Sequence, residues 1–178
     1  PDMTIAENVF IGREPGSRLF VSRKQLEEQT RVLAARIGLE RNPRALVRDL
    51  SVAEQQMVEI ARALSMKSRV IVMDEPTSAL SRAEVEKLFD IIRGLKRDGF
   101  STIFVTHRLE EVFEICDRYT VLRDGRHVGS GAVAETTLDG IIRLMVGREL
   151  GLLASREISY ATSEVALSVE GLSRRRKS

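Results

Sequence analysis

Two neighbouring carboxylates and one histidine are the side chains best suited to chemistry in this sequence. Asp74 and Glu75 directly follow the apolar run Val70–Met73. His107 ends a segment that begins with a second apolar run, Thr102–Thr106. One carboxylate can hold Mg²⁺, which prefers hard oxygen ligands and keeps several waters. The other can orient a water molecule for attack on a phosphate. The alternative is that this carboxylate pair only caps the turn that follows.

Two strands and one helix are expected to position these side chains. Both apolar runs are short, continuous and β-branched, which predicts strands buried on both faces. A capping box of Ser81 and Glu84 opens the helix between them. That helix has the clearest 3.6-residue periodicity in the chain, through Val85, Leu88, Phe89, Ile92 and Leu95. Strand–helix–strand order predicts a parallel α/β sheet, in which ligands bind beyond the carboxyl ends of the strands.

Other helix starts are predicted from serine and threonine residues that can serve as N-caps. Thr4 precedes a short apolar stretch, and Ser22 with Gln25 has the spacing of a capping box. Ser51 and Glu54 have the same spacing and open a helix that runs to about residue 66. We also expect a short helix over residues 109–116.

The last third of the chain changes character along its length. Asp124-Gly125 between two apolar-polar segments predicts a hairpin. Leu138, Ile141 and Met145 predict one more helix. Residues 149–163 are interpreted as a linker, and the alternating pattern of residues 165–172 predicts a half-exposed strand without a partner.

Composition limits the possible classes of protein. The chain has 178 residues, with 43% apolar and 30% charged residues, as in soluble globular proteins. This balance excludes disordered, collagen-like and disulfide-scaffold classes. The 28 basic and 26 acidic residues give a net charge of +2. Four of the cations lie in one run, residues 174–177, so the charge pattern gives no broad nucleic-acid footprint.

Other sequence features indicate a cytosolic chain. Cys116 is the single cysteine, which excludes an internal disulfide. No apolar run approaches the ~20 residues that a membrane span needs. The first 20 residues lack the basic and then apolar pattern of a secretory signal. Because the sequence begins with Pro1 rather than methionine, we expect a piece of a longer polypeptide.

Four elements, in this order, resemble the ATP-binding cassette (ABC) ATPase family. Residues 50–56 look like its signature, Asp74-Glu75 like its Walker B strand, residues 78–80 like its D-loop, and His107 like its switch histidine. The longer segments LSVAEQQMVEIARAL at 50–64, DEPTSAL at 74–80, RLEEVFEICD at 108–117 and MVGRE at 145–149 narrow the resemblance. The resemblance covers residues 1–148. The wording is nearest to the first cassette of double-cassette importers for sugars such as ribose, xylose and galactose.

The resemblance implies a role for each chemical side chain. Asp74 would help hold Mg²⁺, and Glu75 would polarise the attacking water or act as its base. His107 would contact and sense the γ-phosphate of ATP. Ser78 and Ala79 would belong to the D-loop beside the nucleotide.

The start of the signature helix would face ATP that is bound to an opposing cassette. Ser51, Val52, Ala53 and Glu54 would form this contact, since a helix N-terminus favours anions. The family usually has two glycines where this chain has Val52 and Ala53. The resemblance therefore implies that Ser51 serves the weaker of two composite ATP sites.

The phosphate-cradling motif G-x-x-x-x-G-K-[ST] does not occur in the sequence. The expected fold class is therefore an α/β P-loop NTPase core of ABC type with a helical signature subdomain, truncated at its N-terminus. We expect residues 1–66 to form the helical subdomain, 67–148 half of the catalytic core, and 149–178 a linker and the start of a second cassette.

The resemblance implies ATP hydrolysis that energises monosaccharide import, with ATP and Mg²⁺ as cofactors, although these 178 residues are expected to be inactive alone. The implied partners are a second cassette, a membrane permease at the cytoplasmic face and, indirectly, a sugar-binding protein. No nucleic acid is expected. Two alternatives come from other classes: a non-catalytic cassette that only binds a partner, and a soluble ABC ATPase acting on ribosomes or DNA.

Overall fold

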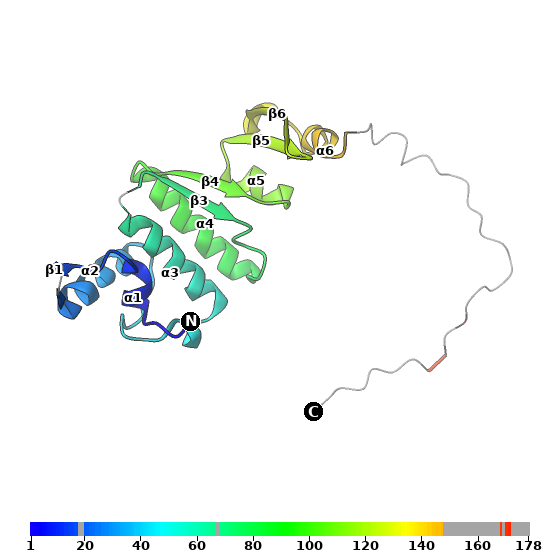
Figure 1. Cartoon of the computed structure of the whole chain (residues 1–178). Helices are drawn as coiled ribbons and strands as arrows, with labels where there is room; N and C mark the ends of the chain where they lie inside the picture. Colours follow the sequence, from blue (N-terminus) through cyan, green and yellow to red (C-terminus); the bar gives the residue numbers. More distant parts are fainter. Residues whose placement is uncertain (18–19, 67, 148–167, 169, 172–178) are drawn as a thin grey trace, which may run out of the picture.

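The computed structural model describes residues 1–17, 20–66, 68–147, 168, 170 and 171, which combine helices and strands (Figure 1). Within these ranges no helix is both long and apolar enough to cross a bilayer. The elements are, in chain order, α1 (Ile5–Phe10), β1 (Gly16–Ser17), β2 (Phe20–Val21), α2 (Arg23–Arg36), η1 (Val47–Asp49), α3 (Val52–Ser65), β3 (Val70–Asp74), α4 (Arg82–Arg97), β4 (Ser101–Val105), α5 (Leu109–Ile115), β5 (Arg118–Arg123), β6 (Arg126–Ala132), η2 (Val133–Glu135) and α6 (Leu138–Val146), where η marks a 3₁₀ turn.

Some of the predicted segments lie outside the described residues. The linker over 149–163 and the basic run over 174–177 fall wholly outside them. Only residues 168, 170 and 171 of the predicted strand over 165–172 are described. Conversely, the short antiparallel pair β1–β2 has no counterpart in the predictions.

Capping boxes form at three helix starts; the boxes at Ser51 and Ser81 are those predicted, whereas at Thr4 only the N-cap was predicted. The three boxes are Thr4 with Glu7 before α1, Ser51 with Glu54 before α3, and Ser81 with Glu84 before α4. At Ser22 only half of the predicted box forms, because the hydroxyl accepts from the Gln25 amide at 3.4 Å. The Ser22 amide instead donates to the carbonyl of Pro15 at 2.9 Å. The predicted starts of α1, α2, α3 and α4 are all confirmed.

The predicted strand–helix–strand unit forms a parallel pair. β3 and β4 run side by side from Val70 opposite Ser101 to Asp74 opposite Val105. α4 connects them, and α4 and α3 lie on one side of the pair (Figure 1). Because the strands are parallel and in register, the residues that follow Asp74 and Val105 emerge at the same edge of the sheet.

The prediction that both faces of these strands are buried is wrong for the described structure. Ile71 and Met73 are buried, but Val72 is 65% exposed and Ile103 is 53% exposed. The alternation of β3 turns every second side chain away from the helices. In the described ranges α3 and α4 cover only one face, so the apolar side chains on the other face stay exposed.

The core joins the helical part of the chain to the sheet. One continuous cluster contains buried side chains of α1, α2, α3, β3 and α4. Phe89 on α4 is fully buried and meets Phe104 of β4 edge-to-face, with ring centroids 6.0 Å apart. This contact therefore packs α4 against β4, the strand that precedes His107.

The predicted hairpin follows this unit in the chain and is confirmed. β5 and β6 pair antiparallel around Asp124 and Gly125, which have φ angles of 52° and 72°. Two consecutive positive φ values characterise the tight type I′ connection, and this geometry favours Asp-Gly. α6 packs against both strands and ends at Gly147 with a φ of 72°.

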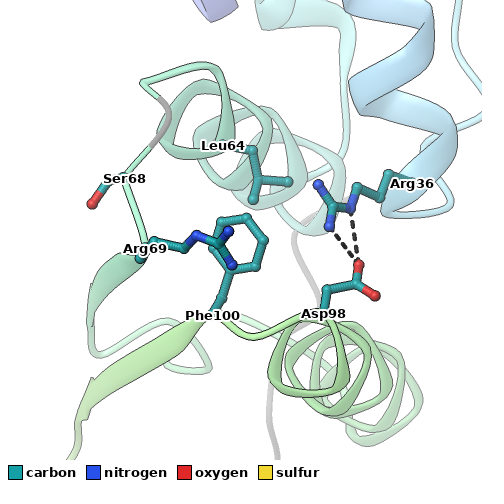
Figure 2. A pocket seen from close by; sticks show the side chains of 6 residues that line it. All are labelled: Arg36, Leu64, Ser68, Arg69, Asp98 and Phe100. Atoms are coloured by element: carbon teal, nitrogen blue, oxygen red, sulfur yellow. Dashed lines mark hydrogen bonds and ion pairs between the residues drawn. The ribbon is translucent and has the colours of Figure 1, made fainter.

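A hollow of about 380 Å³ lies where β3 and β4 begin (Figure 2). Asp74 and His107 lie at the other end of these strands. Its lining includes Arg69, just before β3, and Phe100, just before β4. Both Arg36 and Arg69 lie over the Phe100 ring, at 5.1 and 5.9 Å from its centroid. Arg36 also pairs with Asp98, which links the end of α2 to the end of α4. We interpret this hollow as a joint between helices.

Replacement of Phe89 by alanine tests the place of α4 in the core. The lost contacts and the resulting cavity are expected to lower the free energy of unfolding by about 3–5 kcal/mol. Val32→Ala, at a side chain that is 65% exposed on α2, is the control and is expected to change it by less than about 0.5 kcal/mol. Urea unfolding followed by circular dichroism measures both, and equal effects would contradict the assignment.

Candidate functional site

Glu75 and His107 meet where the two parallel strands end. The Glu75 amide donates to the carbonyl of Val105 at 2.9 Å, which extends the pairing of β3 and β4 by one residue. Nδ1 of His107 lies 2.7 Å from Oε1 of Glu75. The His107 side chain is 73% exposed and that of Glu75 is 36% exposed. The two residues predicted to be catalytic are therefore in direct contact at an accessible edge of the sheet.

The backbone of Glu75 has an uncommon conformation. Its φ angle is 45°, in the left-handed region that residues other than glycine rarely occupy. The next residue, Pro76, disfavours the right-handed helical region for the residue before it. Such outliers often occur at functional sites. Oε2 of Glu75 is buried and has no hydrogen-bond partner among the described residues, so this oxygen can accept from a bound group.

Asp74 is the last residue of β3 and is exposed. The strand alternation puts it on the same face as Val72, opposite Val105. Within the described ranges no group of three or more His, Cys, Asp or Glu residues could enclose a metal ion. Mg²⁺ is commonly held by one or two carboxylates together with waters and phosphate oxygens, so an accessible Asp74 suits a magnesium–nucleotide complex better than a closed metal site.

Ser78 and Ala79 lie in the turn between β3 and α4. Both are exposed, whereas the preceding Thr77 is fully buried. The Ser78 amide donates to the Glu75 carbonyl at 3.2 Å, which closes the turn. Ser78 and Ala79 are therefore presented at the surface directly after the carboxylate pair.

The predicted phosphate-facing group at the start of α3 is partly occupied by its own helix. The Ser51 amide donates to Oε2 of Glu54 at 2.9 Å, and the Ser51 hydroxyl accepts from the Glu54 amide at 3.3 Å. Val52 is 53% exposed, whereas Ala53 is buried. Of the described residues at this helix start, Ser51 and Val52 offer the accessible surface.

Arg41 completes this arrangement. Its Nε lies 2.6 Å from Oε1 of Glu54. The Arg41 hydrogen bond, followed by donation from the Ser51 amide, lowers the pKa of the Glu54 carboxyl below its usual value. Sequence reasoning missed this pair, because Arg41 and Glu54 are 13 residues apart in a region without periodicity. No hydrogen bond or ion pair joins this group to the Glu75–His107 pair among the residues described.

Sequence reasoning also missed a buried polar cluster behind the Glu75–His107 pair. Glu111 of α5 is only 4% exposed and accepts from the hydroxyls of Thr77 and Thr106. Arg108 lies 2.8 Å from its other oxygen. A fully buried carboxylate requires such partners. The sequence signal that could have indicated this cluster is the pair of threonines, Thr77 and Thr106, beside the residues predicted to be catalytic.

The fold that carries the βαβ unit, the carboxylate–histidine contact and the capped helix is similar to that of ABC-type ATP-binding cassettes. A family model described as "ABC transporter" matches residues 1–78. Two solved ATP-binding cassettes of ABC transporters are similar to the chain, with TM-scores of 0.63 and 0.64, identities of 26% and 25%, and coverage of 73% and 74% of this chain and 55% and 56% of theirs. In sequence and in fold, the chain is therefore similar to ATP-binding proteins of ABC transporters.

Among curated relatives, ribose import ATP-binding protein RbsA of Rhodococcus jostii is 48% identical over 98% of this chain. Ribose import ATP-binding protein RbsA 2 of Streptomyces coelicolor is 49% identical over the same share. These matches cover 35% and 33% of the two relatives, so the chain spans about a third of their length.

Acid titration tests the role of Glu54 at the start of α3. A carboxyl whose folded pKa is lowered stabilises the fold above its unfolded pKa, and this contribution disappears as the pH falls through the folded pKa. Glu54→Gln is therefore expected to reduce the free energy of unfolding at pH 7. The difference from the unmodified chain should narrow as the pH falls below about 4.

Glu59→Gln, an exposed position on the same helix, is the matched control. It is expected to follow the unmodified chain across the range. Urea unfolding at a series of pH values measures all three proteins. A Glu54→Gln difference that is constant from neutral to acid pH would contradict the assignment.

Proposed function

We propose that this chain works in ATP hydrolysis that drives the import of a monosaccharide of the ribose type. The observation that carries the proposal is the 2.7 Å contact between Glu75 and His107 at the carboxyl ends of parallel strands. Relatives that align with 98% of the chain are named ribose import ATP-binding proteins. The same contact favours hydrolysis over the alternative of a cassette that only binds a partner.

Glu75 is proposed to orient and polarise the attacking water. Its Oε2 is buried and unpartnered, whereas its Oε1 faces His107, so one carboxylate can contact both the imidazole and a further donor. Both ring nitrogens of a protonated histidine donate hydrogen bonds. His107 held through Nδ1 can then direct Nε2–H toward a γ-phosphate oxygen, and its exposure makes that approach possible.

Mg²⁺ with ATP suits the remaining groups of this edge. Asp74 would hold the ion, directly or through water, and Mg²⁺ when bound neutralises charge on the phosphate oxygens. Ser78 and Ala79, exposed in the following turn, would face the nucleotide or the opposing cassette. Mg²⁺ that is bound together with a nucleotide needs an accessible carboxylate rather than a site enclosed by protein ligands, and Asp74 is accessible.

Ser51 and Val52 are proposed to face a second ATP held by an opposing cassette. The Val52 side chain projects where a glycine would leave the backbone open, and Glu54 already uses the Ser51 amide. Ala53 is buried and would contribute only its backbone. Both features reduce the attraction for phosphate, which supports the assignment of this group to the weaker composite site.

The division of the chain follows from the same proposal. Residues 1–66 would form the helical subdomain, 67–148 half of the catalytic core, and 149–178 a linker and the start of a second cassette. The partners would be that cassette, a permease at the cytoplasmic face of the membrane and, indirectly, a sugar-binding protein.

A phosphate-release assay tests the proposal on the 178-residue chain. With ATP and Mg²⁺, the unmodified chain and Glu75→Gln are both expected to release phosphate at the background rate, because the sequence contains no phosphate-cradling G-x-x-x-x-G-K-[ST]. Turnover by the unmodified chain that Glu75→Gln abolishes would show a complete catalytic site within these residues and overturn this part of the proposal.

The gene upstream of the Pro1 codon provides the matching positive test. An in-frame phosphate-cradling motif there would define a longer protein to assay. In that protein, Glu75→Gln is expected to lower ATP turnover by about 10²–10⁴-fold, because it removes a general base. Glu59→Gln, on the exposed face of α3, is the control. Unchanged turnover in Glu75→Gln would contradict the proposed role.

A further inference from the structure

The buried carboxylate of Glu111 touches both loops that carry the Glu75–His107 pair. Thr77, two residues after Glu75, donates its hydroxyl to Oε2 of Glu111 at 3.0 Å. Thr106, directly before His107, donates its hydroxyl to the same oxygen at 3.1 Å. A single oxygen atom of α5 therefore fixes the separation of two loops that come from different strands.

The rest of the carboxylate is also committed to this region. Nη1 of Arg108 lies 2.8 Å from Oε1 of Glu111, although it is too poorly aligned to count as a hydrogen bond. The Arg108 amide donates to the Thr106 hydroxyl at 3.0 Å, so residues on both sides of His107 are held. The Glu111 amide donates to the Arg108 carbonyl at 3.1 Å, which ties the helix start to the loop.

The pair in front of this cluster has little other support. The His107 side chain is 73% exposed, and Glu75 is its hydrogen-bond partner among the described residues. An exposed imidazole that is held by one contact takes its direction from its backbone. The Thr106 hydroxyl holds that backbone on one side, and the Thr77 hydroxyl holds the turn after Glu75 on the other.

We propose that Glu111 is a positioning residue, which holds the loops after β3 and β4 at the separation that brings Glu75 Oε1 onto His107 Nδ1. It acts through Thr77 and Thr106, and among the described residues no hydrogen bond or ion pair joins it to either member of the pair. Its importance for turnover rests on the function proposed above, whereas its control of the Glu75–His107 contact does not.

The spectroscopic test uses the ring nitrogens of the two histidines in the chain. His107 donates from Nδ1 to the Glu75 carboxylate when it carries its proton there, and ¹⁵N shifts report which ring nitrogen is protonated. His127, on β6, is the internal reference. Glu75→Ala, which deletes the acceptor, gives the His107 signals of a broken contact. All spectra are recorded on the full chain at one fixed pH.

Glu111→Ala is expected to move the His107 signals toward those of Glu75→Ala, while the His127 signals stay in place. Thr77→Val removes one donor with little change of shape and is expected to move them in the same direction. Glu111→Gln keeps an acceptor oxygen for both threonines, so it is expected to retain signals near those of the unmodified chain. Glu110→Ala, an exposed neighbour on α5, is the control and is expected to change nothing.

The outcomes separate a positioning role from a structural one. If Glu111→Ala fails to fold, Thr77→Val still decides, because it leaves Thr106 and Arg108 on the carboxylate. His107 signals that remain unchanged in Thr77→Val and Glu111→Ala, with a lowered melting temperature, would reduce Glu111 to a stabilising residue and overturn the proposal. Unchanged signals in Glu75→Ala would also overturn it, because the contact would be absent in solution. Neither result depends on ATP hydrolysis.

Discussion

The parallel pairing of β3 with β4 is the constraint on which the rest of the structure depends. Its register sets Asp74 opposite Val105, and the Glu75 amide adds one more hydrogen bond to the Val105 carbonyl. A slip of one residue would turn every side chain of a strand to the other face. It would remove Met73 from the core, reverse Asp74 and separate Glu75 from His107. The chemistry at the edge is thus fixed by packing in the middle of the sheet.

The helix that links the two strands makes this register possible. Parallel strands need a crossover, and α4 provides it while it buries Phe89 against Phe104. The polar cluster at Glu111 acts just beyond the carboxyl ends of the same strands, where the ladder stops and loops begin. Apolar packing sets where the strands lie, and buried hydrogen bonds set how far apart their loops stand. The two levels of organisation meet at His107.

Local patterns were enough to predict most of the elements and to place Asp74, Glu75 and His107 at or just after strand ends, as the structure has them. Ser51 with Glu54 and Asp124 with Gly125 are short-range signals, and the structure reproduces both. The order of apolar runs around α4 was enough for the parallel unit. Exposure of Val72 was not predictable in the same way, because the same apolar run suits a strand covered on one face or on two. Whether a face of a strand is covered depends on parts of the chain that are distant in sequence.

Contacts between residues far apart in sequence account for the other misses. Arg41 meets Glu54 across 13 positions, and Thr77 meets Glu111 across 34. Neither pair has a periodicity or spacing that marks it. The half-formed box at Ser22 is a smaller case, in which the carbonyl of Pro15 competes for the amide. Pattern reading finds which residues can act, and the fold determines with which partner.

Among the described residues, one face of the β3–β4 pair is left uncovered, and this has a consequence for handling the chain. Val70, Val72, Ile103 and Val105 present β-branched side chains there. Such side chains are already rotationally restricted, so little rotamer entropy is lost when another surface covers them. Hydrophobic attraction weakens on cooling. Self-association through this face therefore increases on warming and decreases in the cold. Solutions of the chain are better kept dilute and cool. Kosmotropic salts such as sulfate would promote self-association.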